Sequence, residues 1–410
     1  MARPTSTNFD AELYKMQCEV IAQGALTNSK RAESFVKGVY PTALKEGSGA
    51  IVWDIHGKRY IDFICALGSN LLGYGNEEII GVCVERLRKG VTFSLGTTLE
   101  IELCHKLKEF FPWTEQFKFL KTGSEACTAA VRIARAKFHG VIGKSLVYSE
   151  GYHGFHDEFV SLSSPAAGVT KHEYIRPLVF PNHPDLTHAA AVIVEPVITD
   201  YSEPRRQWLE WLRKECDRTG CVLIFDEVIT GFRFQKHSVS KFFAIHPDLI
   251  CLGKGIANGL PLAVVGGSRE LMDNPLYFVS STFAGDTLSI AAALKTMELL
   301  QSKLQIKTLW DVGHRFQMSF NAIAPESIRI EGYPTRGVFV GDEHFRALFF
   351  QECSKAGVLF GMSWFFSFPH IHLVDQVLAI CRDVVIKIKT GSVRLEGEMP
   401  KTPFAQKMRG

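Results

Sequence analysis

Residues 221–234 read CVLIFDEVITGFRF, and residues 248–267 read DLICLGKGIANGLPLAVVGG. Each stretch opens with a short apolar run that is typical of a buried strand. The first run ends at a charged residue, Asp226, and the second is followed closely by another, Lys254. Ligands of open parallel sheets bind beyond the carboxyl ends of the strands. The two stretches therefore predict a sheet whose edge carries a carboxylate and an amine.

Strand-like and helix-like segments alternate between about residues 77 and 300. Apolar runs such as QFKFLK, KSLVYS and AAAVIVEPV alternate with amphipathic stretches such as EACTAAVRIARAKF and RQWLEWLRKECDRTG. This alternation predicts an α/β fold with a mostly parallel sheet. From about residue 325 the elements become shorter, which indicates a smaller α+β domain. We expect an N-terminal segment over 1–50, a large domain over 51–303 and a small domain over 304–410.

The composition narrows the class of protein. Hydrophobic residues make up 46% and charged residues 22% of the 410 residues, which is typical of a globular chain. The net charge of +3 and the scattered basic residues give no sign of nucleic-acid binding. No stretch approaches the ~20 apolar residues of a membrane helix. The ten cysteines form no CxxC pair, so we expect neither a zinc site nor a disulfide framework, and a soluble, cytoplasmic protein.

Lys254 and Asp226 are the first catalytic candidates. A lysine in a desolvated site has a lowered pKa and becomes a nucleophile towards carbonyl groups. The ordinary alternative is a lysine whose amine reaches solvent. A carboxylate at the end of an apolar strand needs a cationic or hydrogen-bonded partner. That partner is either a nearby side chain such as Arg233 or a protonated ring nitrogen of a ligand.

Two further loops follow strand-like runs. Thr122-Gly123-Ser124 opens a helix, and a helix N-terminus can bind a phosphate, although a simple helix cap is the alternative. Tyr152 and His153 lie in a glycine-flanked loop, where a flat ring could cover a cofactor. His153 with His156 and Asp157 could instead suggest a metal cluster, but we see no further ligand set and expect no metal.

Several motifs together resemble the class III aminotransferase family of fold-type I enzymes that use pyridoxal 5'-phosphate (PLP), in particular its glutamate-1-semialdehyde aminomutase-like members. The matching pieces span roughly residues 35–390, and they are GAIVWDIHGKRYIDF, KTGSEACTAAVRIARAKFHG, EGYHGFHD, VEPV, CVLIFDEVITGFRF, DLICLGKGIANGLPLAVVGG and STFAGDTLSIAAA. The resemblance implies a large domain with a seven-stranded sheet beside a smaller α+β domain.

The resemblance also implies roles for single residues. Lys254 would hold PLP as a Schiff base, and Asp226 would keep the pyridine nitrogen protonated. Val228 and Tyr152 would cover the two ring faces. The remaining cofactor positions that the resemblance implies are Thr122, Gly123 and Ser124 at the phosphate, His153 and Glu195 beside the cofactor, and Thr282, which would reach the phosphate of a neighbouring subunit. That last position implies a homodimer.

The sequence departs from the aminomutase pattern at substrate positions. The family loop NSPVR reads Asn28-Ser29-Lys30-Arg31 here, and Phe366 stands where the family has a glutamate. Ser29 and Arg31 remain the candidate substrate residues. We therefore expect an aminotransferase with a small-molecule amino donor and a carbonyl acceptor, sugar-derived or otherwise polar. The alternatives are an aminomutase, a decarboxylase or racemase, and a non-catalytic partner protein.

Overall fold

The computed structural model describes residues 9–163 and 168–401. The chain divides into two compact units, Glu77–Lys307 and Met1–Asn76 with Thr308–Gln406. The outermost residues of the predicted terminal segments, 1–8 and 402–410, lie outside the described part. Among the described helices, none combines the length and the apolar character that crossing a membrane requires.

The unit Glu77–Lys307 is built on a seven-stranded sheet, which confirms the predicted α/β fold. Strand β10 is antiparallel to both of its neighbours, while the other strands run in one direction. The order across the sheet is β4 (Gln116–Leu120), β10 (Ala263–Gly267), β9 (Leu249–Leu252), β8 (Val222–Asp226), β7 (Ala189–Val194), β5 (Leu146–Glu150) and β6 (Ile175–Pro177).

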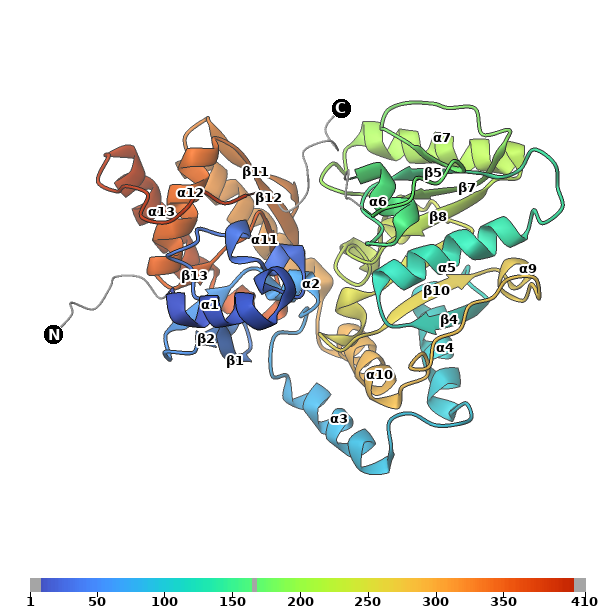
Figure 1. Ribbon diagram of the computed structural model, residues 1–410, viewed down its shortest axis with the longest axis horizontal. Helices are drawn as coiled ribbons and strands as arrows, with labels where there is room; N and C mark the ends of the chain where they lie inside the picture. Colours follow the sequence, from blue (N-terminus) through green and yellow to red (C-terminus); the bar gives the residue numbers. More distant parts are fainter. Residues whose placement is uncertain (1–8, 164–167, 402–410) are drawn as a thin grey trace. The chain divides into compact units, whose positions relative to one another are not determined.

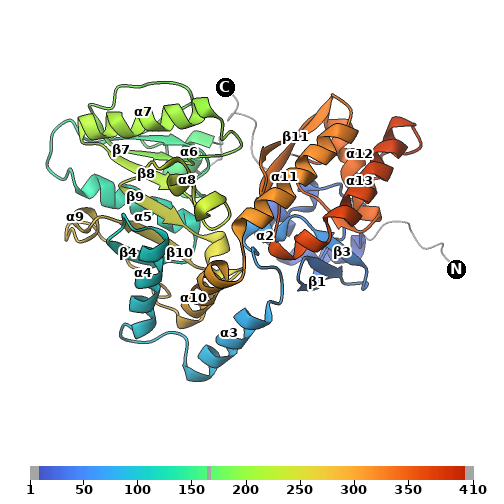
Figure 2. The same ribbon diagram turned by 180° about the vertical axis from the view of Figure 1, so that it is seen from behind.

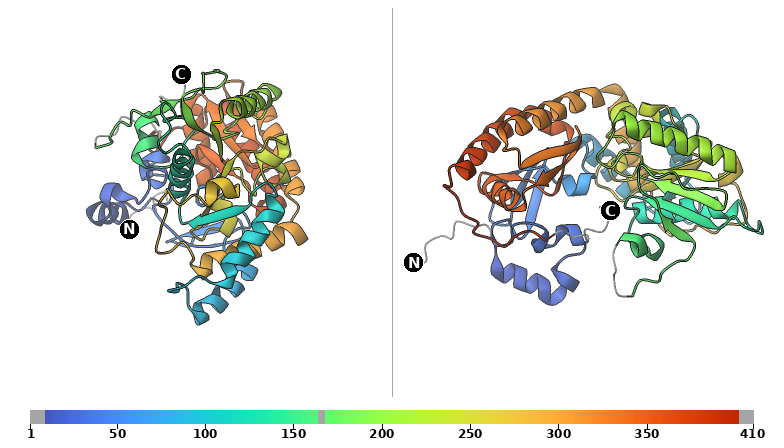
Figure 3. Two further views of the ribbon diagram at one scale, coloured as in Figure 1. Left: turned by 90° about the vertical axis from the view of Figure 1, so that its right-hand side faces the viewer. Right: turned by 90° about the horizontal axis from the view of Figure 1, so that it is seen from above.

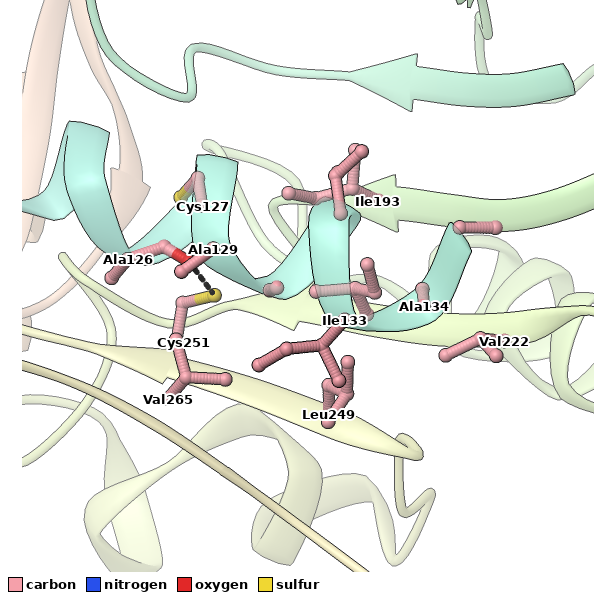
Figure 4. Packing of buried hydrophobic residues seen from close by; sticks show 14 of the residues in the cluster. Ala126, Cys127, Ala129, Ile133, Ala134, Ile193, Val222, Leu249, Cys251 and Val265 are labelled. Carbon is pink, nitrogen blue, oxygen red and sulfur yellow. Dashed lines mark hydrogen bonds between the residues drawn. The ribbon is translucent and has the colours of Figure 1, made fainter. Parts of the chain in front are cut away.

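Helices α5 (Gly123–Ala136) and α7 (Glu203–Thr219) lie on opposite sides of this sheet (Figures 1 and 2). The period-two alternation of the strands explains the two layers. Val222 and Ile224 pack in the cluster that contains the apolar face of α5, whereas Leu223 and Phe225 pack in the cluster that contains α7. Figure 4 shows part of the α5 cluster, including Val222, Leu249 and Cys251. Strands buried on both faces read as continuous apolar runs, as the sequence does here.

The remaining helices of this unit are shorter or lie at its edge. Helix α10 packs against α3, α4 and η5, with ten of its side chains buried. These elements are α3 (Glu77–Lys89), α4 (Thr98–Phe110), α6 (Asp157–Ser163), η4 (Gln235–His237), α8 (Val239–Phe243), η5 (Lys254–Ala257), α9 (Arg269–Met272) and α10 (Thr287–Ser302).

The other unit holds two small sheets. One has the order β1 (Leu44–Ser48), β2 (Ile51–Asp54), β3 (Arg59–Asp62) and β13 (Val358–Leu359), and the other has the order β11 (Ile328–Tyr333), β12 (Arg336–Gly341) and β14 (Ser363–Phe365). The helices are α1 (Ala11–Val20), η1 (Ala22–Gly24), η2 (Asn28–Lys30), η3 (Ala32–Ser34), α2 (Cys65–Gly68), α11 (Ile306–Ile323), α12 (Glu343–Lys355), η6 (Phe368–His372) and α13 (Val374–Lys389). The long orange and red helices α11 and α13 run along one side of the strands (Figure 3, right).

The structure differs from the sequence expectation in where residues 51–76 belong. The sequence placed them in the large domain, whereas the structure groups them with the C-terminal part of the chain. The reason is a long-range pairing, because β3 runs parallel to β13 with Ile61 opposite Val358. A pairing across almost 300 residues leaves no local signal in the sequence.

An aromatic cluster forms much of the core of this second unit. Phe63, Phe316, Phe360, Trp364 and Phe366 are buried, and the ring centroids of Phe63 and Phe316 are 5.6 Å apart. Phe316 also meets the edge of Trp364 at 5.3 Å and of Phe366 at 5.6 Å. Offset and edge-to-face contacts of this kind add to the burial of the rings.

We predict that Phe316→Ala lowers the free energy of unfolding of this unit by ~3–5 kcal/mol, because it leaves a cavity among four rings. Met318→Ala on the same helix is the matched control, since Met318 is 58% exposed, and its cost should be within about 0.5 kcal/mol. Urea unfolding followed by tryptophan fluorescence measures both. Equal losses in the two variants would contradict the assignment of this core.

Candidate active site

Polar residues gather where the parallel strands end. Thr122, Tyr152, Glu195, Asp226 and Lys254 stand at or just beyond the carboxyl ends of β4, β5, β7, β8 and β9. These strands share one direction, so their ends lie along one edge of the sheet. This edge is where an open α/β sheet binds its ligand.

Asp226 is the last residue of β8 and is only 5% exposed. The alternation of the strand turns it to the face that carries Val222 and Ile224, which is the face covered by α5. Its Oδ2 accepts from His153 Nδ1 at 2.8 Å and from Cys127 Sγ at 3.2 Å. Its Oδ1 accepts from the backbone N–H of Val228 at 3.0 Å. The carboxylate is therefore held by three donors.

Asp226 and His153 form a buried ion pair. Burial alone would raise the pKa of Asp226, but the hydrogen bond and the charge of His153 bring it below its ordinary value. Burial alone would lower the pKa of His153, but the hydrogen bond and the charge of Asp226 raise it to about 10. Both side chains are therefore charged at neutral pH. Arg233, the sequence-based candidate for pairing with Asp226, is also buried, but the cationic partner that contacts this carboxylate is His153.

Lys254 follows β9 in an unusual backbone conformation. Its φ is +43°, which a lysine rarely adopts, and it begins the short helix η5. Strained backbone of this kind costs about 1–3 kcal/mol and tends to occur at functional sites. The side chain is partly buried. This backbone conformation is a second reason to treat Lys254 as a functional candidate.

The first residue of helix α5, Gly123, lies next to the side chain of Val228. Thr122 is the N-cap, with its Oγ1 accepting from Glu125 N at 3.2 Å, while Glu125 Oε2 accepts from Thr122 N at 2.7 Å. This reciprocal cap leaves the first N–H groups of the helix for a ligand or solvent. A Cβ on Gly123 would lie 2.9 Å from Cγ1 of Val228, so only glycine lets the loop approach this side chain.

The loop that carries Tyr152 and His153 packs on the same helix end. Gly154 has a φ of +106°, and a Cβ there would lie 2.2 Å from Ser124 Oγ. Phe155 N donates to that same oxygen at 3.3 Å. The loop that carries the aromatic ring and the loop suited to a phosphate are therefore in direct contact.

A second ion pair, which is largely buried, supports this loop. Arg205, in the first turn of α7, binds both carboxylate oxygens of Glu150 at 2.8 and 2.7 Å and donates to the carbonyl of Glu195. Glu195 in turn accepts from Tyr152 N at 2.8 Å. Arg205 thus ties the ends of β5 and β7 together and supports the position of Tyr152. Tyr152 itself is 42% exposed, which leaves its ring accessible.

Three further sequence candidates are Thr282, Ser29 and Arg31. Thr282 belongs to the same unit and is exposed. Ser29 lies in η2 and Arg31 directly follows it, both in the other unit. Their part in substrate binding stays a prediction. Phe366 is fully buried in the aromatic core of that unit.

Sequence reasoning missed Cys127 and the pair Arg205–Glu150. Cys127 lies on α5 just after its first turn, and no motif in the sequence singles out its thiol. Its Sγ, His153 Nδ1 and Asp226 Oδ2 lie within 4.8 Å of one another, as a metal site would require. The separations of 2.8 and 3.2 Å are hydrogen-bond distances, and we interpret the cluster as a hydrogen-bonded network.

The ion pair of His153 makes stability depend on pH. A histidine with a raised folded-state pKa stabilises fully below its unfolded pKa of about 6.5 and loses this contribution as the pH rises through 10. We therefore predict that the wild-type urea midpoint falls more steeply between pH 7 and 10 than that of His153→Gln.

The control is His139→Gln, which changes an exposed histidine on the same unit and should follow the wild type. Urea midpoints measured every half pH unit test the prediction. Parallel curves for the wild type and His153→Gln would show that His153 is not charged in the folded protein.

Comparison with known proteins agrees with this geometry. The family described as "Aminotransferase class-III" matches residues 35–186 and 172–369. The chain is 32% identical over 328 residues to a 3-aminobutyryl-CoA aminotransferase of Cloacimonas acidaminovorans, covering 76% of this chain and 78% of the relative. It is 30% identical over 424 residues to a glutamate-1-semialdehyde 2,1-aminomutase of Aquifex aeolicus, covering 91% and 98%.

Solved structures show the same fold. The FumI protein of Sphingopyxis sp. MTA144 superposes with a TM-score of 0.85 at 23% identity, covering 95% of this chain and 98% of that one. An omega-transaminase from Sphaerobacter thermophilus gives a TM-score of 0.80 at 22% identity, covering 93% and 98%. From the family match and the relatives at about 30% identity, we conclude that this chain belongs to the class III aminotransferase family of enzymes, whose cofactor is pyridoxal phosphate.

Proposed function

We propose that the protein is an aminotransferase that moves an amino group from an amino-acid donor to a carbonyl compound, with Lys254 as the lysine that binds PLP. The observation that carries this proposal is the charged, buried Asp226 on the same sheet edge as Lys254 and the N-terminus of α5. A carboxylate, an amine and a phosphate-binding helix end are the three groups that a pyridine aldehyde phosphate needs.

The residues of this edge fit the cofactor. Asp226 has one acceptor position left on Oδ1, which suits a protonated ring nitrogen. Thr122, Gly123 and Ser124 offer a helix N-terminus to the phosphate. Val228 touches that loop from β8, which would place it against the ring. Tyr152 presents an exposed aromatic ring from the adjoining loop.

Bound PLP supplies an electron sink that stabilises negative charge at the carbon next to the substrate nitrogen. The chain supplies the proton handling. Asp226 keeps the ring nitrogen protonated, because its own pKa is held low by His153. Lys254 Nζ acts first as a base that takes the proton from the substrate carbon, and then as an acid that donates it to a different carbon. Glu195 and Arg205 hold the backbone of Tyr152.

Two observations favour transfer between molecules over migration within one. The loop Asn28-Ser29-Lys30-Arg31 and Phe366 depart from the aminomutase pattern at substrate positions. The relative from Cloacimonas carries the name of an aminotransferase. A polar carbonyl, such as one derived from a sugar, is the acceptor class that we favour. Aminomutase activity is the second candidate, because the Aquifex relative is matched over 98% of its length.

We predict that mixing the PLP-loaded protein with its amino-acid donor and no acceptor releases a keto acid and leaves the cofactor as pyridoxamine phosphate. A panel of amino acids, read by absorbance and by mass spectrometry of the cofactor, identifies the donor. Lys254→Ala should lower turnover by about 10²- to 10⁴-fold or more, because the proton carrier is lost. Lys241→Ala, a lysine outside this edge, is the control.

Borohydride treatment should attach the phosphopyridoxyl mass to Lys254 in the wild type. No labelled Lys254 would overturn the cofactor assignment. A labelled Lys254 combined with an isomer of the substrate and no keto product would instead establish the aminomutase.

We also propose a homodimer in which Thr282 completes the site of the partner subunit. Thr282 lies on an exposed segment with apolar side chains that a monomer would leave in water: Leu276 is 62%, Phe278 76% and Phe283 58% exposed. Exposed apolar side chains that cluster along one segment are typical of an interaction surface.

The shared site predicts complementation. Lys254→Ala and Thr282→Val should each be impaired, whereas mixed dimers contain one site with both wild-type residues. Refolding the two variants together should restore about a quarter of wild-type activity, since random pairing makes half of the dimers mixed. Activity that stays at the average of the two variants would contradict the role of Thr282 in the partner's site.

A further inference from the structure

The Cys127 thiol has a use beyond filling the core. Cys127 lies in the first turns of α5, fully buried, on the face that meets the sheet (Figure 4). Its Sγ donates to Asp226 Oδ2 at 3.2 Å, within the range of sulfur hydrogen bonds. A thiol that only filled space would not need to point at a carboxylate.

The acceptor positions of Asp226 show what this contact does. A carboxylate has about four lone-pair positions, two on each oxygen. His153 and Cys127 occupy both positions on Oδ2, and Val228 N occupies one on Oδ1. Among the described residues, the vacant position is on Oδ1. With the thiol in place, Oδ2 has no acceptor position left for a further donor.

We propose that Cys127 is a positioning residue for Asp226, and that its thiol, together with His153, fixes the carboxylate so that Oδ1 is the oxygen presented to the ring nitrogen of the cofactor. The inference rests on the proposed role of Asp226. Without the thiol, the carboxylate keeps two of its three donors, His153 on Oδ2 and Val228 N on Oδ1, and Oδ2 regains a vacant acceptor position. Both oxygens could then compete for the ring nitrogen.

The surroundings keep Cys127 a donor. Burial, the adjacent Cys251 thiol and the charge of Asp226 all raise the pKa of Cys127 well above its ordinary value, so the sulfur keeps its proton. Cys251, which donates to the backbone carbonyl of Ala126 at 3.6 Å, belongs to the same cluster (Figure 4). Cys127 therefore has its proton available for Asp226.

Three substitutions separate donation from packing. Cys127→Ser keeps a donor, Cys127→Val keeps the volume without a donor, and Cys127→Ala removes both. A packing role predicts that valine replaces cysteine better than serine does. A positioning role predicts the reverse order. Cys216→Ala, which changes a buried thiol on the α7 side of the sheet, is the control.

The first measurement is the rate at which the PLP-loaded protein loses its cofactor on dilution. We expect Cys127→Val and Cys127→Ala to lose it about 5- to 10-fold faster than the wild type, which is the effect of one ordinary hydrogen bond because the thiol is a weak donor. Cys127→Ser and Cys216→Ala should stay within about 2-fold. If valine does not fold, the comparison of alanine with serine carries the test.

The second measurement is the Nδ1–H proton resonance of His153 in protein labelled with 15N-histidine. It should move downfield in the valine and alanine variants, because Oδ2 then serves one donor instead of two, and remain near its wild-type position in the serine variant. Wild-type protein that binds no PLP would defeat the proposed function. Wild-type protein that binds PLP, with valine matching the wild type and serine not, would defeat only the role of Cys127.

Discussion

A negative charge buried at the end of β8 is the constraint on which the rest of the site depends. Asp226 is almost inaccessible to water, and burial by itself would drive it towards the neutral form. A neutral acid could not keep a pyridine nitrogen protonated. The protonated His153 reverses this tendency, and the backbone N–H of Val228 donates a further hydrogen bond to the carboxylate. Removing any one of these groups leaves a buried charge less well compensated.

The fold supplies these groups from elements that are distant in the sequence. Parallel strands bring the ends of β4, β5, β7, β8 and β9 to one edge, and the alternation of β8 turns Asp226 towards α5 rather than α7. The network then continues outward, from His153 along its loop to Tyr152, and from Tyr152 to Glu195 and Arg205. The first link is the backbone of the loop, and the others are hydrogen bonds of Glu195, so the backbone of Tyr152 is fixed beside the ring that it carries.

Much of this was predictable from the sequence, for an identifiable reason. The apolar runs that end at Asp226 and shortly before Lys254 are local signals, and they predicted both the parallel sheet and its polar edge. The partner of Asp226 was harder, because His153 stands 73 residues away and only the folded sheet brings it to 2.8 Å. The sequence-based placement of residues 51–76 in the large domain differs from the structure for the same reason. Their grouping with the C-terminal part depends on the long-range pairing of β3 with β13. Cys127 was missed because a buried cysteine looks the same in sequence whether or not it donates.

The candidate cofactor residues and the candidate substrate residues belong to different units of the chain. Every residue that we propose for the cofactor belongs to Glu77–Lys307. The substrate candidate Ser29 belongs to the other unit, as do Arg31 and Phe366, where the sequence departs from the aminomutase pattern. Within Glu77–Lys307, His153, Cys127 and Val228 N compensate the buried charge of Asp226, so replacing one of them leaves that charge less well compensated. Ser29 and Arg31 compensate no buried charge of that network, whereas Phe366 is constrained by its packing in the aromatic core. Relatives of this chain at about 30% identity bear the names of an aminotransferase and of an aminomutase, so membership of the family leaves the choice between these two reactions open.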